Sequence, residues 1–230
     1  MLNDLKQVSV VIPVVNDSSA LEGLLSALAP FRELEIVVVD GGSDDCSIDD
    51  PQPPVRLLKT ECGRALQLNA GIASTQRPWL WFLHADSVVT RPVVEALQLA
   101  LTGAQWGRFD VSLSGVTPGL RLIAAAMNQR SAMTSICTGD QGIFVRRTLL
   151  HRIGGIPDQP LMEDVELSKR LRRIAKPTRI RTLLGTSPRR WEKDGIVRTV
   201  LLMWELRLRY FLGASPEALA ARYYPDRRWM

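Results

Sequence analysis

Polar and acidic side chains follow several apolar runs of strand length in the first hundred residues. Asn16 and Asp17 come after the run that reaches Pro13. Asp40 closes the next run, and Asp86 follows a third. Ligands of parallel sheets bind beyond the carboxyl ends of the strands, so we expect these side chains to share one site. A carboxylate beside a divalent cation holds a diphosphate, because the metal neutralises charge on the leaving group.

A metal position is predicted at Asp86. His84 lies two residues earlier, so on a regular strand its side chain shares that face. A histidine with an aspartate suits Mn²⁺ somewhat better than Mg²⁺. We therefore expect a divalent cation, Mn²⁺ or Mg²⁺, at Asp86 with His84 as the second ligand. The alternative is that His84 is only a hydrogen-bonded histidine at the end of a strand.

The segment after Asp40 is rich in glycine. A carboxylate there can accept hydrogen bonds from a base or a ribose, and Gly41 and Gly42 let the backbone approach a ligand closely. A turn-forming aspartate is the alternative. No G-x-G-x-x-G follows the first strand and no G-x-x-x-x-G-K-[ST] occurs, so the sequence lacks the dinucleotide and P-loop fingerprints.

Two further groups of candidate residues lie in the second half of the chain. Glu163 and Asp164 stand at a helix start, where the helix dipole favours acids whatever the function. Asp164 becomes a candidate general base only if it faces the Asp86 cluster. Arg190 and Trp191 place a cation beside an aromatic ring. The arginine can contact a diphosphate, and the tryptophan can stack on a sugar or an acceptor. A basic surface loop is the alternative for these last two.

Strand and helix patterns alternate along the first hundred residues. The expected strands are 8–13, 35–40, 55–58 and 79–83, and the expected helices are 18–28, 63–74 and 92–101. Runs that are continuously apolar are typical of parallel strands covered on both faces. The alternation therefore predicts an α/β fold, with a mostly parallel central sheet and helices on both faces.

The second half is less regular. It predicts strands at 109–113 and 178–184, an apolar run at 143–145, and helices at 120–132, 163–174 and 195–212. The last helix carries five apolar residues at helical spacing: Val197, Leu201, Trp204, Leu208 and Phe211. We expect this face to pack on the sheet. The alternative is a basic amphipathic helix that lies on anionic lipid.

Composition and charge limit the class of protein. The chain has 230 residues, of which 46% are hydrophobic and 23% charged, which excludes a disordered, collagen-like or disulfide-scaffold chain. Residues 1–170 hold 15 basic and 19 acidic residues, for −4, whereas residues 171–230 hold 14 and 5, for +9. An acidic body with a basic tail indicates an anionic partner near the tail, namely a phosphate, a membrane face or nucleic acid. The alternative is a solvated arginine-rich surface. The sequence has no nucleic-acid-binding motif, so we expect no nucleic-acid partner.

The sequence also predicts a compartment. Its three cysteines have no metal-ligand spacing and are expected to be reduced thiols. The polar start of the chain does not read as a signal peptide, and no apolar stretch is long enough to span a membrane. We expect a cytoplasmic protein, at the inner face of the plasma membrane if the last helix makes a peripheral contact with lipid.

Taken in order, these segments resemble the family-2 glycosyltransferases of the GT-A fold. The matching segments are Val-Val-Ile-Pro-Val-Val-Asn-Asp (10–17), Ile-Val-Val-Val-Asp-Gly-Gly-Ser-Asp-Asp (36–45), Gly-Arg-Ala-Leu-Gln-Leu-Asn-Ala-Gly-Ile (63–72), Phe-Leu-His-Ala-Asp-Ser (82–87), Thr-Gly-Asp-Gln-Gly-Ile-Phe (138–144), Met-Glu-Asp-Val-Glu-Leu (162–167) and Arg-Arg-Trp (189–191). His-Ala-Asp and Gly-Asp-Gln-Gly, in a short chain, are similar to a small bacterial subgroup, the arsenosugar-biosynthesis glycosyltransferases.

The resemblance implies one glycosyltransferase domain over residues 1–230. Residues 1–105 would form the nucleotide-sugar-binding half, 106–194 the acceptor half, and 195–230 a basic amphipathic helix and tail. The implied activity is metal-assisted hexosyl transfer from a nucleotide-diphosphate sugar, a UDP-sugar at family level, to the hydroxyl of a small-molecule or lipid acceptor. One carboxylate base without a carboxylate nucleophile on the opposite face implies inversion.

The resemblance also implies roles for residues. Asp164 would be the catalytic base, Asp86 the metal-binding acid, and His84 the tentative second ligand. The nucleotide sugar would contact Pro13, Asn16, Asp17, Asp40, Gly42, Gly63, Arg64 and Asp86. The acceptor and diphosphate would contact Asp140, Gln141, Glu163, Arg190 and Trp191. The chain departs from the family in two places: His84 replaces the first acid of Asp-x-Asp, and Ser187 replaces the Gln of Gln-x-x-Arg-Trp.

Two other functions compete with glycosyl transfer. A sugar nucleotidyltransferase also uses an α/β nucleotide fold, but its Gly-rich phosphate loop after the first strand is missing here. A membrane-surface binding module would make the basic C-terminal helix the functional element. Release of pyrophosphate would indicate the first alternative, and dependence on lipid the second.

Overall fold

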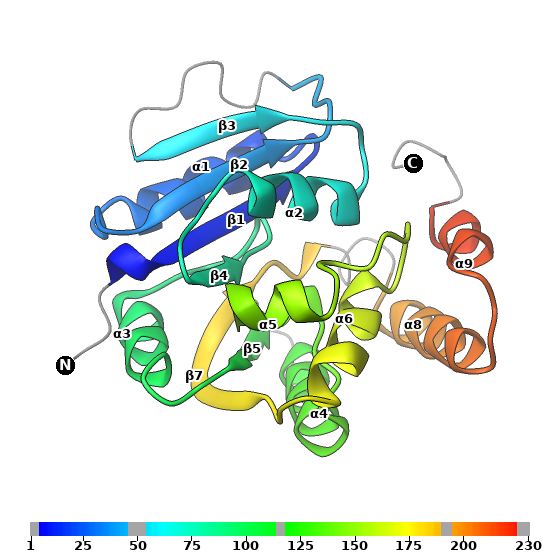
Figure 1. The fold of residues 1–230 in the computed structure, drawn as a ribbon. Helices are drawn as coiled ribbons and strands as arrows, with labels where there is room; N and C mark the ends of the chain where they lie inside the picture. The colour runs from blue at the N-terminus through cyan, green and yellow to red at the C-terminus, as the bar shows by residue number, and fades with distance from the viewer. Residues whose placement is uncertain (1–4, 46–53, 114–117, 190–194, 225–230) are drawn as a thin grey trace.

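A seven-stranded mixed sheet forms the centre of the protein (Figure 1), in a computed structural model that describes residues 5–45, 54–113, 118–189 and 195–224. The strand order is β3-β2-β1-β4-β6-β5-β7. The strands are β1 Val8–Val14, β2 Glu35–Asp40, β3 Val55–Lys59, β4 Trp79–Phe82, β5 Trp106–Leu113, β6 Phe144–Arg146 and β7 Thr178–Thr186. The α-helices are α1 Ser18–Leu28, α2 Arg64–Ala73, α3 Arg91–Ala100, α4 Pro118–Thr134, α5 Arg147–Arg152, α6 Glu163–Arg172, α8 Ile196–Phe211 and α9 Pro216–Tyr223.

The first half folds as the sequence predicts. Strand β1 pairs in parallel with β2 on one side and β4 on the other, and β2 pairs in parallel with β3. Successive β1 residues bury opposite faces: Val10 and Ile12 pack with α1 and α3, whereas Val11 packs with α2, α5 and α6. Both faces of the sheet are therefore covered by helices, which explains the continuous apolar runs.

The second half adds the mixed part of the sheet. The three-residue strand β6 runs antiparallel to both β4 and β5, and β5 runs parallel to β7. The sequence marks β6 only as an apolar run, and the short helices α5 and α9 were not predicted. The predicted ends of the other helices and strands lie within about three residues of the observed ones.

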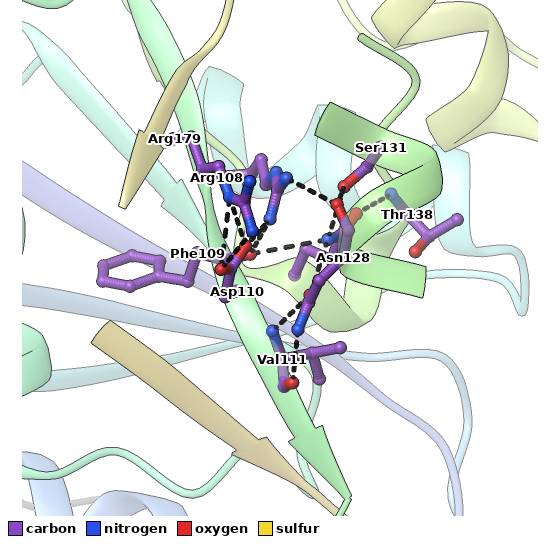
Figure 2. A network of polar contacts seen from close by, with 9 residues as sticks. Arg108, Phe109, Asp110, Val111, Asn128, Ser131, Thr138 and Arg179 are labelled. Atoms are coloured by element: carbon purple, nitrogen blue, oxygen red, sulfur yellow. Dashed lines mark hydrogen bonds and ion pairs between the residues drawn. The ribbon is translucent and has the colours of Figure 1, made fainter. Parts of the chain in front are cut away.

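A buried polar network joins α4 to β5 (Figure 2). Strand β5 pairs with β6 only at its first two residues, and in the described part of the chain no strand lies beside the rest of that edge. The Asn128 amide takes the place of a strand: Oδ1 accepts from the Val111 N–H at 2.8 Å and Nδ2 donates to the Val111 carbonyl at 2.9 Å. Asp110 is held by Arg108 and, at 2.8 Å, by Arg179. The network fixes α4 against the sheet, and α4 forms one wall of the site described below.

The expectation that the apolar face of the last helix packs on the sheet is wrong. Helix α8 packs through its opposite side, where Leu206 is fully buried with residues of α9. The predicted face is exposed instead, with exposed fractions from 59% at Leu208 to 83% at Phe211. Both sides of α8 are apolar, so the periodicity did not show which one would be buried. In the described part of the chain, none of the helices has the length and apolarity needed to cross a bilayer.

Candidate active site

The loops that follow β1 and β2 hold each other at the carboxyl edge of the sheet. Asn16 has a left-handed backbone, with φ of 49°, and its Oδ1 accepts a hydrogen bond from the Asp44 N–H at 2.7 Å. Its own N–H donates to the Ser43 hydroxyl at 2.9 Å. Asp17, the next residue, forms an ion pair of 2.8 Å with Arg189. These contacts place Asn16 and Asp17 at the predicted edge.

Asp40 forms the turn that the sequence left open as an alternative. Its Oδ1 accepts hydrogen bonds from the Gly42 N–H, the Ser43 N–H and, at 2.6 Å, the Ser43 hydroxyl. Gly42 has φ of 91°, a conformation that favours glycine, and no atom lies within 4 Å of where its Cβ would be. The loop therefore leaves open space at Gly42, and contact of Asp40 with a base remains a prediction.

A cavity of about 520 Å³ opens between this edge of the sheet and helices α4, α6 and α8. Six of the predicted site residues line it: Arg64, His84, Asp86, Asp140, Glu163 and Asp164. They come from segments far apart in the chain, namely the start of α2, the end of β4, the turn before β6 and the start of α6. The cavity therefore brings together residues that are distant in the sequence and were related there mainly by the order of their motifs. A cavity of this size can hold a small ligand.

Three acids, Asp86, Asp140 and Asp17, lie close enough to interact electrostatically near the end of β4. Burial raises the pKa of Asp86, and the charges of Asp140 and then Asp17 raise it further, while Arg189 lowers it. A carboxylate in this position fits a divalent cation, because the added charge would relieve the repulsion. The described residues contain no group of three or more metal-ligating side chains. A cation at Asp86 remains a prediction, and one held by a single carboxylate would be completed by substrate phosphates, as Mg²⁺ sites often are.

His84 forms part of the cavity wall. A Cβ added at Gly139 would lie 2.3 Å from His84 Nε2, so the glycine makes room for the ring. Burial and the nearby Arg64 charge lower the pKa of His84 to about 3. The imidazole is therefore neutral at physiological pH, the form that can ligate a metal. Its role as the second ligand remains a prediction.

Asp164 is fixed at the start of α6, and its role as a general base remains a prediction. It lines the same cavity as Asp86. Its Oδ2 accepts a hydrogen bond from the Gly139 N–H at 2.9 Å, and its Oδ1 accepts one from the Val165 N–H at 2.6 Å. Two backbone donors fix the carboxylate in place, and its remaining lone pairs are available to a hydroxyl proton.

Glu163 is almost fully buried beside Asp164. Its Oε1 lies 3.3 Å from Arg64 Nη1. Burial raises the pKa of Glu163 to about 7, and the Asp164 charge adds to this, although Arg64 opposes it. Arg64 is the first residue of α2 and follows Gly63, so this ion pair ties the two halves of the cavity wall together.

The raised pKa of Glu163 predicts greater stability in mild acid. The native carboxyl ionises at about 7, against a reference value of 4.5. The native state binds this proton more tightly than the unfolded state, so the stabilisation is complete below about pH 4.5 and is lost as the pH rises through about 7. We expect a loss of about 2–3 kcal/mol between about pH 5 and about pH 7.5, measured by urea unfolding. Glu163→Gln should remove this component, and an unchanged pH dependence in that variant would contradict the assignment.

Some predicted residues lie outside the cavity. Gln141 is fully buried, accepts a hydrogen bond from the Thr138 N–H at 3.2 Å and donates to the Ser131 hydroxyl at 3.0 Å. Its buried side chain stabilises the turn that carries Asp140, on the side away from the cavity. Pro13 borders a small void of about 20 Å³ that adjoins the cavity and shares Arg64, His84, Glu163 and Asp164 with its lining. Arg190 and Trp191 lie outside the described residues.

Sequence reasoning missed two arginines that line the cavity. Arg130 comes from α4 and Arg207 from α8. Nε and Nη2 of Arg130 are buried without a hydrogen-bond partner. Each buried, unpartnered donor costs roughly 1–3 kcal/mol, so their presence needs an explanation. No motif marks either arginine, since each sits in an ordinary helical stretch, and only the packing of α4 near α8 brings them together.

Comparisons with known proteins agree with this arrangement. Residues 9–105 match the family model described as glycosyl transferase family 2. The chain is 26% identical over 241 residues to "Probable glycosyltransferase YdaM" of Bacillus subtilis (strain 168), covering 92% of this chain but 56% of that protein. The chain therefore spans little more than half of that curated relative.

Two solved structures are similar in fold. The mannosyltransferase PcManGT of Pyrobaculum calidifontis, in complex with GDP-Man and Mn²⁺, has a TM-score of 0.63 and 21% identity, covering 96% of this chain and 70% of that one. S. aureus TarS 1-349, in complex with UDP-GlcNAc, has a TM-score of 0.62 and 16% identity, covering 78% and 58%. The GT-A fold predicted from the sequence is thereby confirmed, and residues 9–105 carry the match to glycosyl transferase family 2 within it.

Proposed function

We propose that the protein transfers a sugar from a nucleotide-diphosphate donor to an acceptor hydroxyl. The observation that carries this proposal is that Asp86 and Asp164 line one cavity at the carboxyl edge of the sheet. The family match over residues 9–105 and the names of the similar proteins support it. In this proposal residues 1–105 bind the nucleotide sugar and residues 106–194 bind the acceptor.

The donor we propose is a UDP-sugar. TarS is described in complex with UDP-GlcNAc, and glucosyl-3-phosphoglycerate synthase from Mycobacterium tuberculosis in complex with UDP and Mn²⁺. That synthase has a TM-score of 0.56 and 18% identity, covering 78% of this chain and 70% of that one. PcManGT is described with GDP-Man, so GDP is the alternative to be tested beside UDP. The motif resemblance to the arsenosugar-biosynthesis subgroup remains part of this proposal.

The residues of the cavity divide the reaction between them. Asp164, fixed by two backbone donors, takes the proton of the acceptor hydroxyl as its oxygen attacks the anomeric carbon. Glu163 is buried and held by Arg64, which leaves Asp164 as the better placed carboxylate. A base without a carboxylate nucleophile supports a single displacement with inversion. A divalent cation at Asp86 would neutralise charge on the departing diphosphate.

Calorimetric titration tests the donor site. We expect UDP, and not GDP, to bind in the presence of Mn²⁺ or Mg²⁺ and to bind far more weakly in EDTA. Failure of both nucleotides under every condition would contradict the proposed function. Product analysis addresses the nucleotidyltransferase alternative: glycosyl transfer releases nucleoside diphosphate, whereas nucleotidyl transfer releases pyrophosphate.

The outer face of α8 supports a second proposal, peripheral contact with an anionic membrane. Its apolar residues are mostly exposed and lie three to four positions apart: Val197, Leu201, Trp204, Leu208 and Phe211, followed by Leu212. Arg198 and Arg209 flank this face, and residues 171–230 carry a charge of +9. An apolar stripe bordered by arginines suits the boundary between acyl chains and anionic headgroups. The proposed location is therefore the cytoplasmic side of the plasma membrane.

Vesicle flotation tests the membrane proposal. We expect the protein to float with vesicles that contain phosphatidylglycerol and to bind pure phosphatidylcholine at least about tenfold more weakly. Leu208→Asp/Phe211→Asp should abolish flotation. The control Leu99→Asp/Leu183→Asp replaces two exposed apolar residues on α3 and β7 and should float as the wild type does. Concentration-dependent dimerisation through α8 without flotation would instead assign the face to a second copy.

A further inference from the structure

The proposed reaction leaves two cations of the cavity unused. Arg130 on α4 and Arg207 on α8 both line the cavity that contains Asp164. Nε and Nη2 of Arg130 are fully buried and have no hydrogen-bond partner. These two nitrogens form one edge of the planar guanidinium, the edge that binds two oxygens of a phosphate or carboxylate at once. Both nitrogens are screened from solvent in this conformation, so the guanidinium would turn toward the cavity that Arg130 lines to present this fork to an anion.

The charges around this edge also favour an anion. Burial and the positive charge of Arg207 lower the pKa of Arg130 to about 10, so the two guanidinium groups repel each other. Asp164 and Asp140 attract Arg130 electrostatically, but neither bonds to its Nε–Nη2 edge. A ligand with two or more anionic oxygens would satisfy both donors and relieve the repulsion between the cations.

We propose that Arg130, together with Arg207, binds an anionic group of the phosphate class that the acceptor carries. This proposal rests on the proposed glycosyl transfer and names its acceptor class. The two arginines lie in the half of the chain that follows β5, on the side of the base Asp164. The expected nucleotide residues lie elsewhere: Asp17 follows β1, and Asp40 is the last residue of β2.

The side chains next to the arginines indicate the chemistry of the rest of this acceptor. Apolar side chains of α4 and α8 line the same cavity: Ile123, Ala126, Met127, Val200, Met203 and Trp204. Trp204 is also 67% exposed on the outer face of α8. The cavity thus pairs an anion fork with an apolar wall that continues to the surface. An amphiphilic phosphate, with its hydroxyl directed toward Asp164, fits this combination.

Binding of a small amphiphilic phosphate tests the site directly. We expect calorimetry with hexyl phosphate to show saturable binding, inorganic phosphate to bind more weakly, and 1-hexanol not to bind. Arg130→Gln should weaken hexyl phosphate binding at least about tenfold. Arg130→Lys should give an intermediate loss, because lysine keeps the charge but not the fork. Arg207→Gln provides a second variant should Arg130→Gln fold poorly.

A matched control lies on the same helix. Arg121 is an exposed arginine of α4 that does not line the cavity, so Arg121→Gln removes an equal charge and should leave hexyl phosphate binding unchanged. UDP binding with Mn²⁺ should change less than about twofold in Arg130→Gln. That result would separate the acceptor side from the donor diphosphate.

Two results would overturn the proposal. If wild-type protein binds none of the phosphates, or binds them equally well after Arg130→Gln, the anion site does not exist. If hexyl phosphate competes with UDP and Arg130→Gln weakens both equally, the arginines serve the donor instead. Failure of the proposed function appears separately, as wild-type protein that binds neither UDP nor GDP.

Discussion

Asp164→Asn should lower the turnover number for sugar transfer by about 10²–10⁴-fold, the usual effect of removing a general base. The amide keeps the shape of the side chain, and its oxygen can still accept from the Gly139 N–H, while its nitrogen loses only the local hydrogen bond from the Val165 N–H, so the cavity should keep its form. The binding of UDP should stay within about twofold of wild type, because the base acts on the acceptor. Single-turnover release of nucleoside diphosphate measures the chemical step directly.

A neighbouring acid provides the control for Asp164. Glu166 lies in the same first turn of α6 but forms surface ion pairs with Lys169 and Arg170 and does not line the cavity. Glu166→Gln changes the charge of that turn by the same amount, so turnover should fall less than about threefold. Near wild-type turnover in Asp164→Asn, or equal losses in the two variants, would remove Asp164 from the role of base.

The first half of the fold was predictable because its signals are local and repeated. Strands buried on both faces appear as continuous apolar runs, and parallel strands place their carboxyl ends at one edge. These signals therefore predict a common site for Asp17 and Asp86. The short strand β6 could not be assigned a direction, because three residues carry no periodicity of their own.

The parts of the site that the sequence did not predict depend on packing between distant helices. Arg130 and Arg207 are 77 positions apart, and each is unremarkable in its own helix until α4 and α8 form walls of one cavity. Helix α8 presents a similar difficulty. It is apolar on both sides, so its pattern fits burial through Leu206 as well as burial through Leu208, and tertiary contacts decide between them.

Asp86→Ala should abolish the metal-dependent part of nucleotide binding, a loss of at least about 100-fold in affinity for UDP in the presence of Mn²⁺. Asp86 is the acid at the end of β4, with Asp140 and Asp17 close enough to raise its pKa. No described cluster of three ligating side chains could take its place. Binding in EDTA should be equally weak in the variant and the wild type, because that component does not use the carboxylate.

The variant should fold, which makes the loss interpretable. Burial and neighbouring acids disfavour the ionised form of Asp86, so replacing it relieves repulsion in the native state. Asp158→Ala removes an exposed acid outside the cavity and should bind UDP as the wild type does. If Asp86→Ala kept its metal dependence, the cation would be held elsewhere and the motif assignment at residues 84–86 would be wrong. If the wild type bound UDP equally well in EDTA, the charge of the diphosphate would have to be met by arginines, and Arg64, Arg130 and Arg207 would be the next residues to replace.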